Sequence, residues 1–176
     1  MIFSETELKG AYLIEPERKE DNRGFFARTY CVNEFKEFGL NTNLVQCSIS
    51  FNKKKGTLRG MHFQIAPYEE AKVVRCTKGE IFDVIIDLRP NSKTFKKHIS
   101  AVLTEQNRKM LYVPEGFAHG FQTLTDNAEV FYQMSQLYSP DYARGVRWND
   151  PVFGIVWPQD DRIIIERDRN YPDFHG

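Results

Sequence analysis

The sequence predicts an all-β protein, an antiparallel sandwich or barrel with a few short helices. Short apolar segments rich in β-branched residues follow one another along the chain, and turns of Gly, Pro and Asn separate them. Strands at this spacing are typical of a sandwich or barrel. Long helices do not alternate with the strands, which excludes a Rossmann-type fold.

One short helix is predicted early in the chain, over residues 33–38. Asn33 can cap its start and Gly39 can end it, because these residue types favour the two ends of a helix. Phe35 and Phe38 would share one face. We expect this helix to pack on the edge of a larger β structure.

Two consecutive segments then predict a β-hairpin. Residues 71–76 and 81–88 are apolar and rich in β-branched side chains, and the turn-like residues 77–80 join them. Further strands are predicted at 109–113 and 121–124, on either side of a turn that contains Pro and Gly.

The last predicted strand covers residues 130–137. Side chains alternate between the two faces of a strand, so Val130, Tyr132 and Met134 would share one face.

Length and charge indicate a single soluble domain that spans residues 1–176. The chain carries 24 Lys and Arg against 24 Asp and Glu, so its formal charge is zero. This balance argues against nucleic acid or a membrane surface as a partner held by bulk charge. No apolar run is long enough to cross a bilayer, and the first residues lack the pattern of a signal peptide. We therefore expect a cytoplasmic protein.

The three cysteines support the same compartment. Cys31, Cys47 and Cys76 are odd in number, widely spaced and arranged in no zinc-binding pattern. We expect them to be reduced, buried thiols.

Two histidines lie in Gly-containing motifs that could carry chemistry. His62 ends a run that starts at Gly56, and His119 ends the motif Pro114-Glu-Gly-Phe-Ala-His. A metal held by His62, Gln64 and His119 is one interpretation, because Zn, Fe and Mn sites need three or more converging ligands. The cationic Lys72 nearby would repel a metal, so the sequence favours a site without one. For His119 alone, a hydrogen-bonded core residue is an equal alternative.

These two motifs resemble the paired half-motifs of the cupin superfamily, whose fold is a small β-jelly roll. A larger set of segments resembles the dTDP-4-dehydrorhamnose 3,5-epimerase family. They occur in the family's order, between about residue 12 and about residue 172, and they are Asp21–Phe26, Gly56–Gln64, Val113–Phe121, Tyr138–Pro140, Trp148–Pro151 and Ile155–Pro158.

The resemblance implies an isomerase that needs no metal or cofactor and that is usually a homodimer. Its substrate would be a nucleotide-diphosphate 4-keto-6-deoxyhexose, inverted at C3, C5 or both. The most direct expectation is conversion of dTDP-4-dehydro-6-deoxy-D-glucose to dTDP-4-dehydro-L-rhamnose. A non-catalytic sugar-binding or nucleotide-binding jelly roll is a further alternative.

Inversion next to a ketone needs a base on one face of the sugar, an acid on the other and a stabilised enolate oxygen. The resemblance assigns His62 as the base and Asp168 as the carboxylate that orients it. It assigns Tyr132 as the acid and Lys72 as the cation beside the enolate oxygen. The residues alone would favour a solvated Asp168, a packing role for Tyr132 and a surface position for Lys72.

The resemblance also implies a set of substrate-binding residues. Arg23, Arg59 and His119 match positions that contact the diphosphate or the sugar, and arginine suits a diphosphate because its guanidinium is a bidentate donor. Tyr138 would stack on the nucleobase. Asp83 is a charge in an apolar strand and would be either a second carboxylate near His62 or a structural residue.

The nucleotide end of the expected site departs from the family pattern. Arg28 stands where the family usually has Glu. The family's usual Gln-x-Asn is Gln46-Cys47-Ser48 in this chain, so Ser48 replaces the Asn, and Ala143 replaces another Glu. We expect the proton-transfer group to be kept, with thymidine, cytidine or another nucleotide as the carrier. The segment with Arg23 and Phe26 would reach a neighbouring subunit's site in a dimer.

Overall fold

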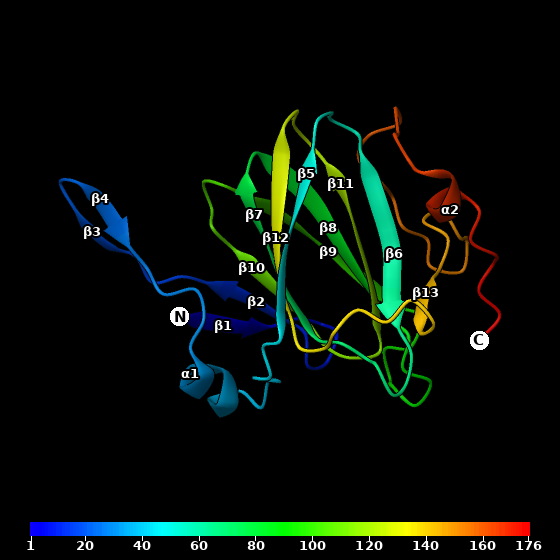
Figure 1. Cartoon of the computed structure of the whole chain (residues 1–176), viewed down its shortest axis with the longest axis horizontal. Helices are drawn as coiled ribbons and strands as arrows, with labels where there is room; N and C mark the ends of the chain where they lie inside the picture. The colour runs from blue at the N-terminus through cyan, green and yellow to red at the C-terminus, as the bar shows by residue number, and fades with distance from the viewer.

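The computed structural model describes residues 1–176 as two large antiparallel β-sheets packed face to face and a separate two-stranded hairpin (Figure 1). The strands are β1 (Ile2–Glu5), β2 (Tyr12–Glu15), β3 (Lys19–Asp21), β4 (Gly24–Phe26), β5 (Gln46–Asn52), β6 (Leu58–Gln64), β7 (Lys72–Lys78), β8 (Glu80–Asp87), β9 (His98–Thr104), β10 (Met110–Val113), β11 (Phe117–Thr123), β12 (Ala128–Met134) and β13 (Ala143–Gly145); the helices are α1 (Val32–Glu37) and α2 (Glu166–Arg169). The predicted all-β sandwich is confirmed.

One sheet has the strand order β1-β2-β10-β7-β12-β5 and the other β13-β6-β11-β8-β9. The main core lies between them, because alternate residues of facing strands point inward. Its members are buried and include Val74, Ile81, Leu111, Phe121 and Val130.

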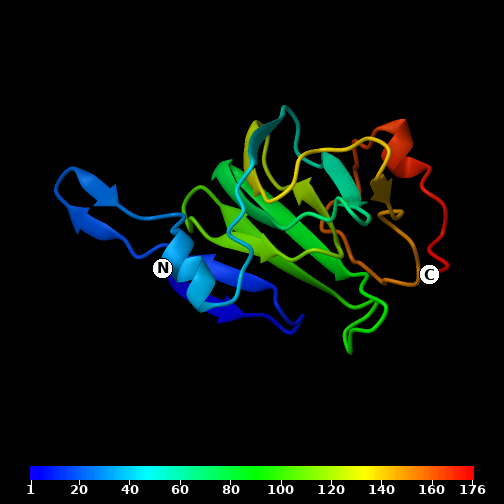
Figure 2. The same cartoon turned by 60° about the horizontal axis from the view of Figure 1, so that its bottom comes forward.

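The outer faces of both sheets are partly covered by other segments. Phe35 of α1 packs with Val73 and Tyr112 on the outside of the six-stranded sheet. On the five-stranded sheet, Trp157 of the C-terminal segment packs with Val84. Figure 2 shows that this C-terminal segment, with α2, lies at the end of the sandwich opposite the β3–β4 hairpin. Helix α2 of this segment contacts β6, the strand that bears His62.

The predicted hairpin over residues 71–88 is wrong, although both of its strands exist. β7 belongs to the six-stranded sheet and β8 to the five-stranded sheet, so the turn between them crosses from one sheet to the other. β10 and β11 are divided between the sheets in the same way. Gly79, with a φ of 72°, makes the sharp turn possible, but turn chemistry is local and does not determine which strands pair.

The early helix forms, but Asn33 does not cap it. The N-cap is Cys31, which makes no side-chain capping hydrogen bond, and Asn33 lies inside the helix. Gly39 follows the C-cap with a φ of 68°, as expected for the end of a helix. Phe35 is buried, and Phe38 stacks on Phe3 with ring centroids 4.3 Å apart.

The expectation of three buried thiols is only partly correct. All three cysteines are free, and Cys76 is buried. Cys31 is half-buried, and Cys47 is exposed because it lies on the outward-facing side of the edge strand β5. No helix has the length and apolar character that crossing a bilayer requires.

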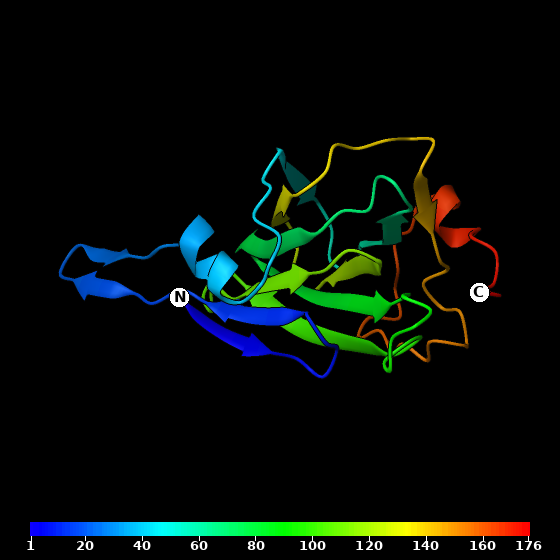
Figure 3. The same cartoon turned by 90° about the horizontal axis from the view of Figure 1, so that it is seen from below.

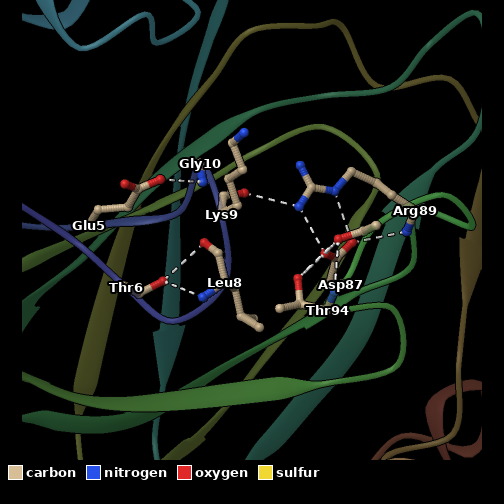
Figure 4. Close-up of polar contacts among 9 residues, drawn as sticks. Glu5, Thr6, Leu8, Lys9, Gly10, Asp87, Arg89 and Thr94 are labelled. Carbon is tan, nitrogen blue, oxygen red and sulfur yellow. Dashed lines mark hydrogen bonds and ion pairs between the residues drawn. The ribbon is translucent and has the colours of Figure 1, made fainter.

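A buried carboxylate fixes one end of the sandwich (Figure 4). Asp87 at the end of β8 accepts hydrogen bonds from Arg89 Nε at 2.9 Å, Ser92 Oγ at 2.5 Å and Thr94 Oγ1 at 2.7 Å. Burial alone would raise the pKa of Asp87, but these hydrogen bonds prevail and lower it to about 2. Arg89 also donates to the carbonyl of Lys9, so the network connects β8 to the turn between β1 and β2.

Candidate functional site

A cavity of about 350 Å³ opens between the two sheets. β5, β7 and β12 of one sheet, β6, β11 and β13 of the other, and the C-terminal segment supply its lining. Nine of the residues selected from the sequence line it: His62, Tyr132, Asp168, Lys72, Arg59, His119, Tyr138, Gln46 and Ser48. The cavity is therefore the candidate active site.

His62 and Asp168 form a dyad between β6 and α2. His62 Nε2 lies 2.8 Å from Asp168 Oδ1, and the backbone N–H of Gly60 donates to Oδ2 at 3.1 Å. The Asp168 side chain is 1% exposed, whereas His62 is 34% exposed toward the cavity. Burial acts to raise the pKa of Asp168, but the hydrogen bonds from His62, Gly60 and Arg167 outweigh it and lower the pKa. Asp168 is therefore ionised. Because it contacts Nε2 of His62, the other ring nitrogen, Nδ1, is available for proton transfer.

Two glycines let the histidine-bearing strands approach closely. His62 on β6 and His119 on β11 are directly paired residues. A Cβ on Gly60 would lie 2.5 Å from the Cα of Gly120, and a Cβ on Gly120 would lie 2.5 Å from Met61 Sδ. Only glycine fits at these positions, so the glycines of both motifs place the two histidines side by side.

His119 belongs to a second carboxylate–histidine pair, deeper than the first. Its Nε2 lies 2.9 Å from Asp83 Oδ2, and both side chains are buried. Of the two alternatives for Asp83, the structure supports the structural one, because its hydrogen-bond partner is His119 rather than His62 and it does not line the cavity. Burial raises the pKa of Asp83, against the opposing effect of His119 and Lys72.

Tyr132 lies on β12, on the cavity wall opposite His62. It shares the inward face with Val130 and Met134, as the alternation predicts. The Tyr132 ring meets the His119 ring edge-on at 6.0 Å. Burial raises the pKa of its hydroxyl, and the negative charge of Asp83 adds to this effect. The phenol therefore stays protonated and can act as an acid.

Lys72 at the start of β7 is a buried cation that lines the cavity. It is 9% exposed, so it is not the surface lysine that the residues alone would favour. Its Nζ lies 2.8 Å from Glu70 Oε1, and Glu70 also lines the cavity.

Residues that the resemblance assigns to the nucleotide and the diphosphate also line the cavity. Arg59 Nε donates to Asn52 Oδ1 at 2.7 Å, which fixes the guanidinium at the cavity edge. Tyr138 is 58% exposed and lines the cavity, and its N–H donates to Gln46 Oε1 at 3.4 Å. Ser48 and Ala143 both line the cavity.

Besides Asp83, three of the selected residues lie outside this cavity. Arg23 and Phe26 belong to the β3–β4 hairpin, which projects away from the sandwich (Figures 1 and 3), and their exposed fractions are 86% for the Arg23 side chain and 74% for Phe26. Arg28 follows the hairpin and pairs with Glu34 at 2.7 Å. Within one chain these side chains cannot contact a ligand in the cavity.

The structure also adds residues that the sequence did not single out. Arg167 contacts both members of the dyad, with Nε 3.1 Å from Asp168 Oδ1 and Nη2 3.3 Å from His62 Nε2. Tyr171 meets the His62 ring at 6.2 Å and leaves no room for a side chain at Gly145. Both lie in an Arg-rich segment without regular periodicity, so the sequence carries no signal for them beyond closeness to Asp168.

Gln64, one of the three ligands of the metal interpretation, is hydrogen-bonded to the protein through both Nε2 and Oε1. Its Nε2 donates to the carbonyls of Tyr68 at 2.9 Å and Leu137 at 3.2 Å, and its Oε1 accepts from the N–H of Ser139 at 2.6 Å. Gln64 therefore holds together two loops at the cavity mouth.

A family model and a relative of similar sequence carry the same name. The family model for dTDP-4-dehydrorhamnose 3,5-epimerase matches residues 5–176. The dTDP-4-dehydrorhamnose 3,5-epimerase of Methanothermobacter thermautotrophicus is 45% identical, over 96% of this chain and 92% of its own.

Two solved structures of enzymes with the same name are similar throughout. The one from Elizabethkingia anophelis has a TM-score of 0.96 at 40% identity and covers 99% of this chain and 96% of its own. The one from Bacillus anthracis, with TDP and PPi bound, has a TM-score of 0.95 at 39% identity and covers 98% of this chain and 99% of its own.

Proposed function

Because the chain belongs to the dTDP-4-dehydrorhamnose 3,5-epimerase family, a family of isomerases with the cupin-type jelly-roll fold, we propose that His62, Tyr132 and Lys72 epimerise a nucleotide-linked 4-keto-6-deoxyhexose in this cavity. The substrate is dTDP-4-dehydro-6-deoxy-D-glucose and the product dTDP-4-dehydro-L-rhamnose. One observation carries the proposal: His62 and Tyr132 come from opposite sheets and face the same cavity. A sugar ring between them has a base on one face and an acid on the other.

The reaction follows from this arrangement. Nδ1 of His62 removes the proton from the carbon beside the ketone. The C–H electron pair forms a C=C bond to the carbonyl carbon, and the C=O π electrons move onto the oxygen to give an enolate. The Lys72 ammonium stabilises the negative oxygen. The Tyr132 hydroxyl then delivers a proton to the opposite face of the carbon, and the ketone re-forms with inverted configuration. Asp168 stabilises the imidazolium while His62 carries the extra proton.

Solvent-deuterium incorporation tests the proposal directly. The protein is incubated in D2O with dTDP-4-keto-6-deoxyglucose, and NMR follows the C3 and C5 protons of the sugar. We expect both signals to disappear and a His62→Ala variant to retain them. Loss of one signal would make the protein a mono-epimerase, and loss of neither would refute proton transfer and favour a binding protein. Exchange that survives dialysis against a chelator would count against the metal interpretation.

A second candidate keeps the chemistry and changes the nucleotide. Ser48 and Ala143 line the cavity with short side chains where the family pattern has Asn and Glu, so two polar contacts to a base are altered. One unpaired polar contact costs about 1–3 kcal/mol, enough to change the preferred base. The test compares turnover of dTDP-, CDP-, UDP- and GDP-linked 4-keto sugars. Near-equal turnover would refute an altered preference.

The projecting hairpin supports a homodimer as part of the proposal. Arg23 and Phe26 are exposed and lie far from their own cavity, which is the arrangement expected if they complete the cavity of a second copy. Light scattering should give twice the chain mass. Co-expression of Arg23→Ala with His62→Ala should restore activity, because hybrid dimers then contain one site with both wild-type residues. A monomer, or no restored activity, would refute the shared site.

A further inference from the structure

Glu70 is a cavity residue to which the reaction above assigns no part. It lies two residues before Lys72, in the loop that leads into β7. Its Oε1 is 2.8 Å from Lys72 Nζ, and the two side chains are 10% and 11% exposed. Both line the cavity, so the ion pair faces the substrate space rather than bulk solvent.

The backbone that carries Glu70 is fixed on both sides. The N–H of Ala71 donates to Ser135 Oγ at 2.8 Å, and the N–H of Ser135 donates to the carbonyl of Ala71 at 2.9 Å. Earlier in the same loop, Gln64 Nε2 donates to the carbonyl of Tyr68 at 2.9 Å. The carboxylate of Glu70 is therefore presented from a braced loop.

Lys72 needs such a partner for two physical reasons. An ammonium so far from water is costly to leave unpaired, and its four-carbon stem has several rotamers. The ammonium has three N–H donors, so one bond to Glu70 leaves two for a ligand oxygen. Donors stabilise a transition state best when they are already aimed at the place where charge develops.

We propose that Glu70 is a positioning residue that holds the Lys72 ammonium at the point where the enolate oxygen forms. The inference rests on the proposed function and extends it. Glu70 acts through its acceptor oxygen and through Lys72 alone. Removal of the side chain should therefore lower kcat and leave substrate binding nearly unchanged.

The first set of variants measures the effect on kcat separately from the effect on KM. Glu70→Ala should reduce kcat roughly tenfold or more, less than the loss of a whole oxyanion donor, with KM within about twofold. Glu70→Gln keeps an acceptor oxygen and should rescue most of that loss. The matched control is Glu69→Ala, because Glu69 is exposed and lies outside the cavity. Thermal midpoints of all variants identify any loss of folding.

A double-mutant cycle tests whether Glu70 works through Lys72. In a Lys72→Met background, Glu70→Ala should cause no further fall in the C3 and C5 exchange rates. The inference would be overturned if Glu70→Ala lowered the exchange rates as much in the Lys72→Met background as in the wild-type background. It would also be overturned if Glu70→Ala left kcat unchanged. In both cases exchange by the wild-type protein would still uphold the proposed function. A wild type without exchange on any nucleotide-linked 4-keto sugar would overturn both.

Discussion

Replacement of Asp168 by Asn tests the dyad with little change in shape. Asp168 accepts on both oxygens: Oδ1 from His62 Nε2 at 2.8 Å and Arg167 Nε at 3.1 Å, and Oδ2 from the N–H of Gly60 at 3.1 Å. An Asn has one acceptor oxygen and one NH2 donor, so it cannot satisfy both sides.

Either orientation of the Asn is unfavourable. If its NH2 faces Gly60, two buried donors meet, at a cost of about 1–3 kcal/mol in folding stability. If its NH2 faces His62, Nε2 must become the acceptor, and the proton moves to Nδ1. That tautomer cannot take a proton from the sugar. General base catalysis by a correctly oriented imidazole raises the reaction rate about 10²- to 10⁴-fold, so kcat should fall by that factor.

The assay is the initial rate of C3 and C5 deuterium exchange, measured beside the thermal midpoint. Glu166→Gln is the matched control, because Glu166 is an exposed carboxylate of the same helix and makes no contact with the dyad. An Asp168→Asn variant that folds and keeps more than about a tenth of the wild-type rate would refute the assigned role, since orientation of the base is worth at least 10²-fold.

Three further predictions concern other parts of the molecule. Tyr132→Phe removes the acid but not the base, so deuterium exchange by His62 should persist while product formation falls about 100-fold; equal loss of both would contradict the division of roles. Asp87→Asn should reduce the free energy of unfolding by about 2 kcal/mol at neutral pH. Because the pKa of Asp87 is lowered to about 2, this contribution is complete above the unfolded pKa near 4 and disappears as the pH falls toward 2; a difference from wild type that stays constant over that range in urea unfolding would refute it. Gly120→Ala places a Cβ 2.5 Å from Met61 Sδ and should destabilise the fold by about 1–3 kcal/mol, visible as a lower thermal midpoint by calorimetry.

The sequence alone predicted what depends on local pattern. Alternating apolar residues and turn residues predicted an all-β sandwich, because strand and turn preferences act within a few residues. The ordered motifs around His62, His119 and Tyr138 indicated the family, which the comparisons confirm. Asp168 was selected only through the resemblance to that family, because its own surroundings gave no reason to expect burial.

Only the tertiary structure decided which distant groups meet. The turn at Gly79 looks like a hairpin because its chemistry is local, yet β7 and β8 belong to different sheets. The partner of Asp83 depends on the register of β8 against β11, which gives it to His119. Glu70 gains a partner in Lys72 only because the braced loop turns both side chains into the cavity. Hydrophobic alternation fixes which face of a strand is buried, but the packing of the sheets determines which strands become neighbours, and the catalytic contacts arise there.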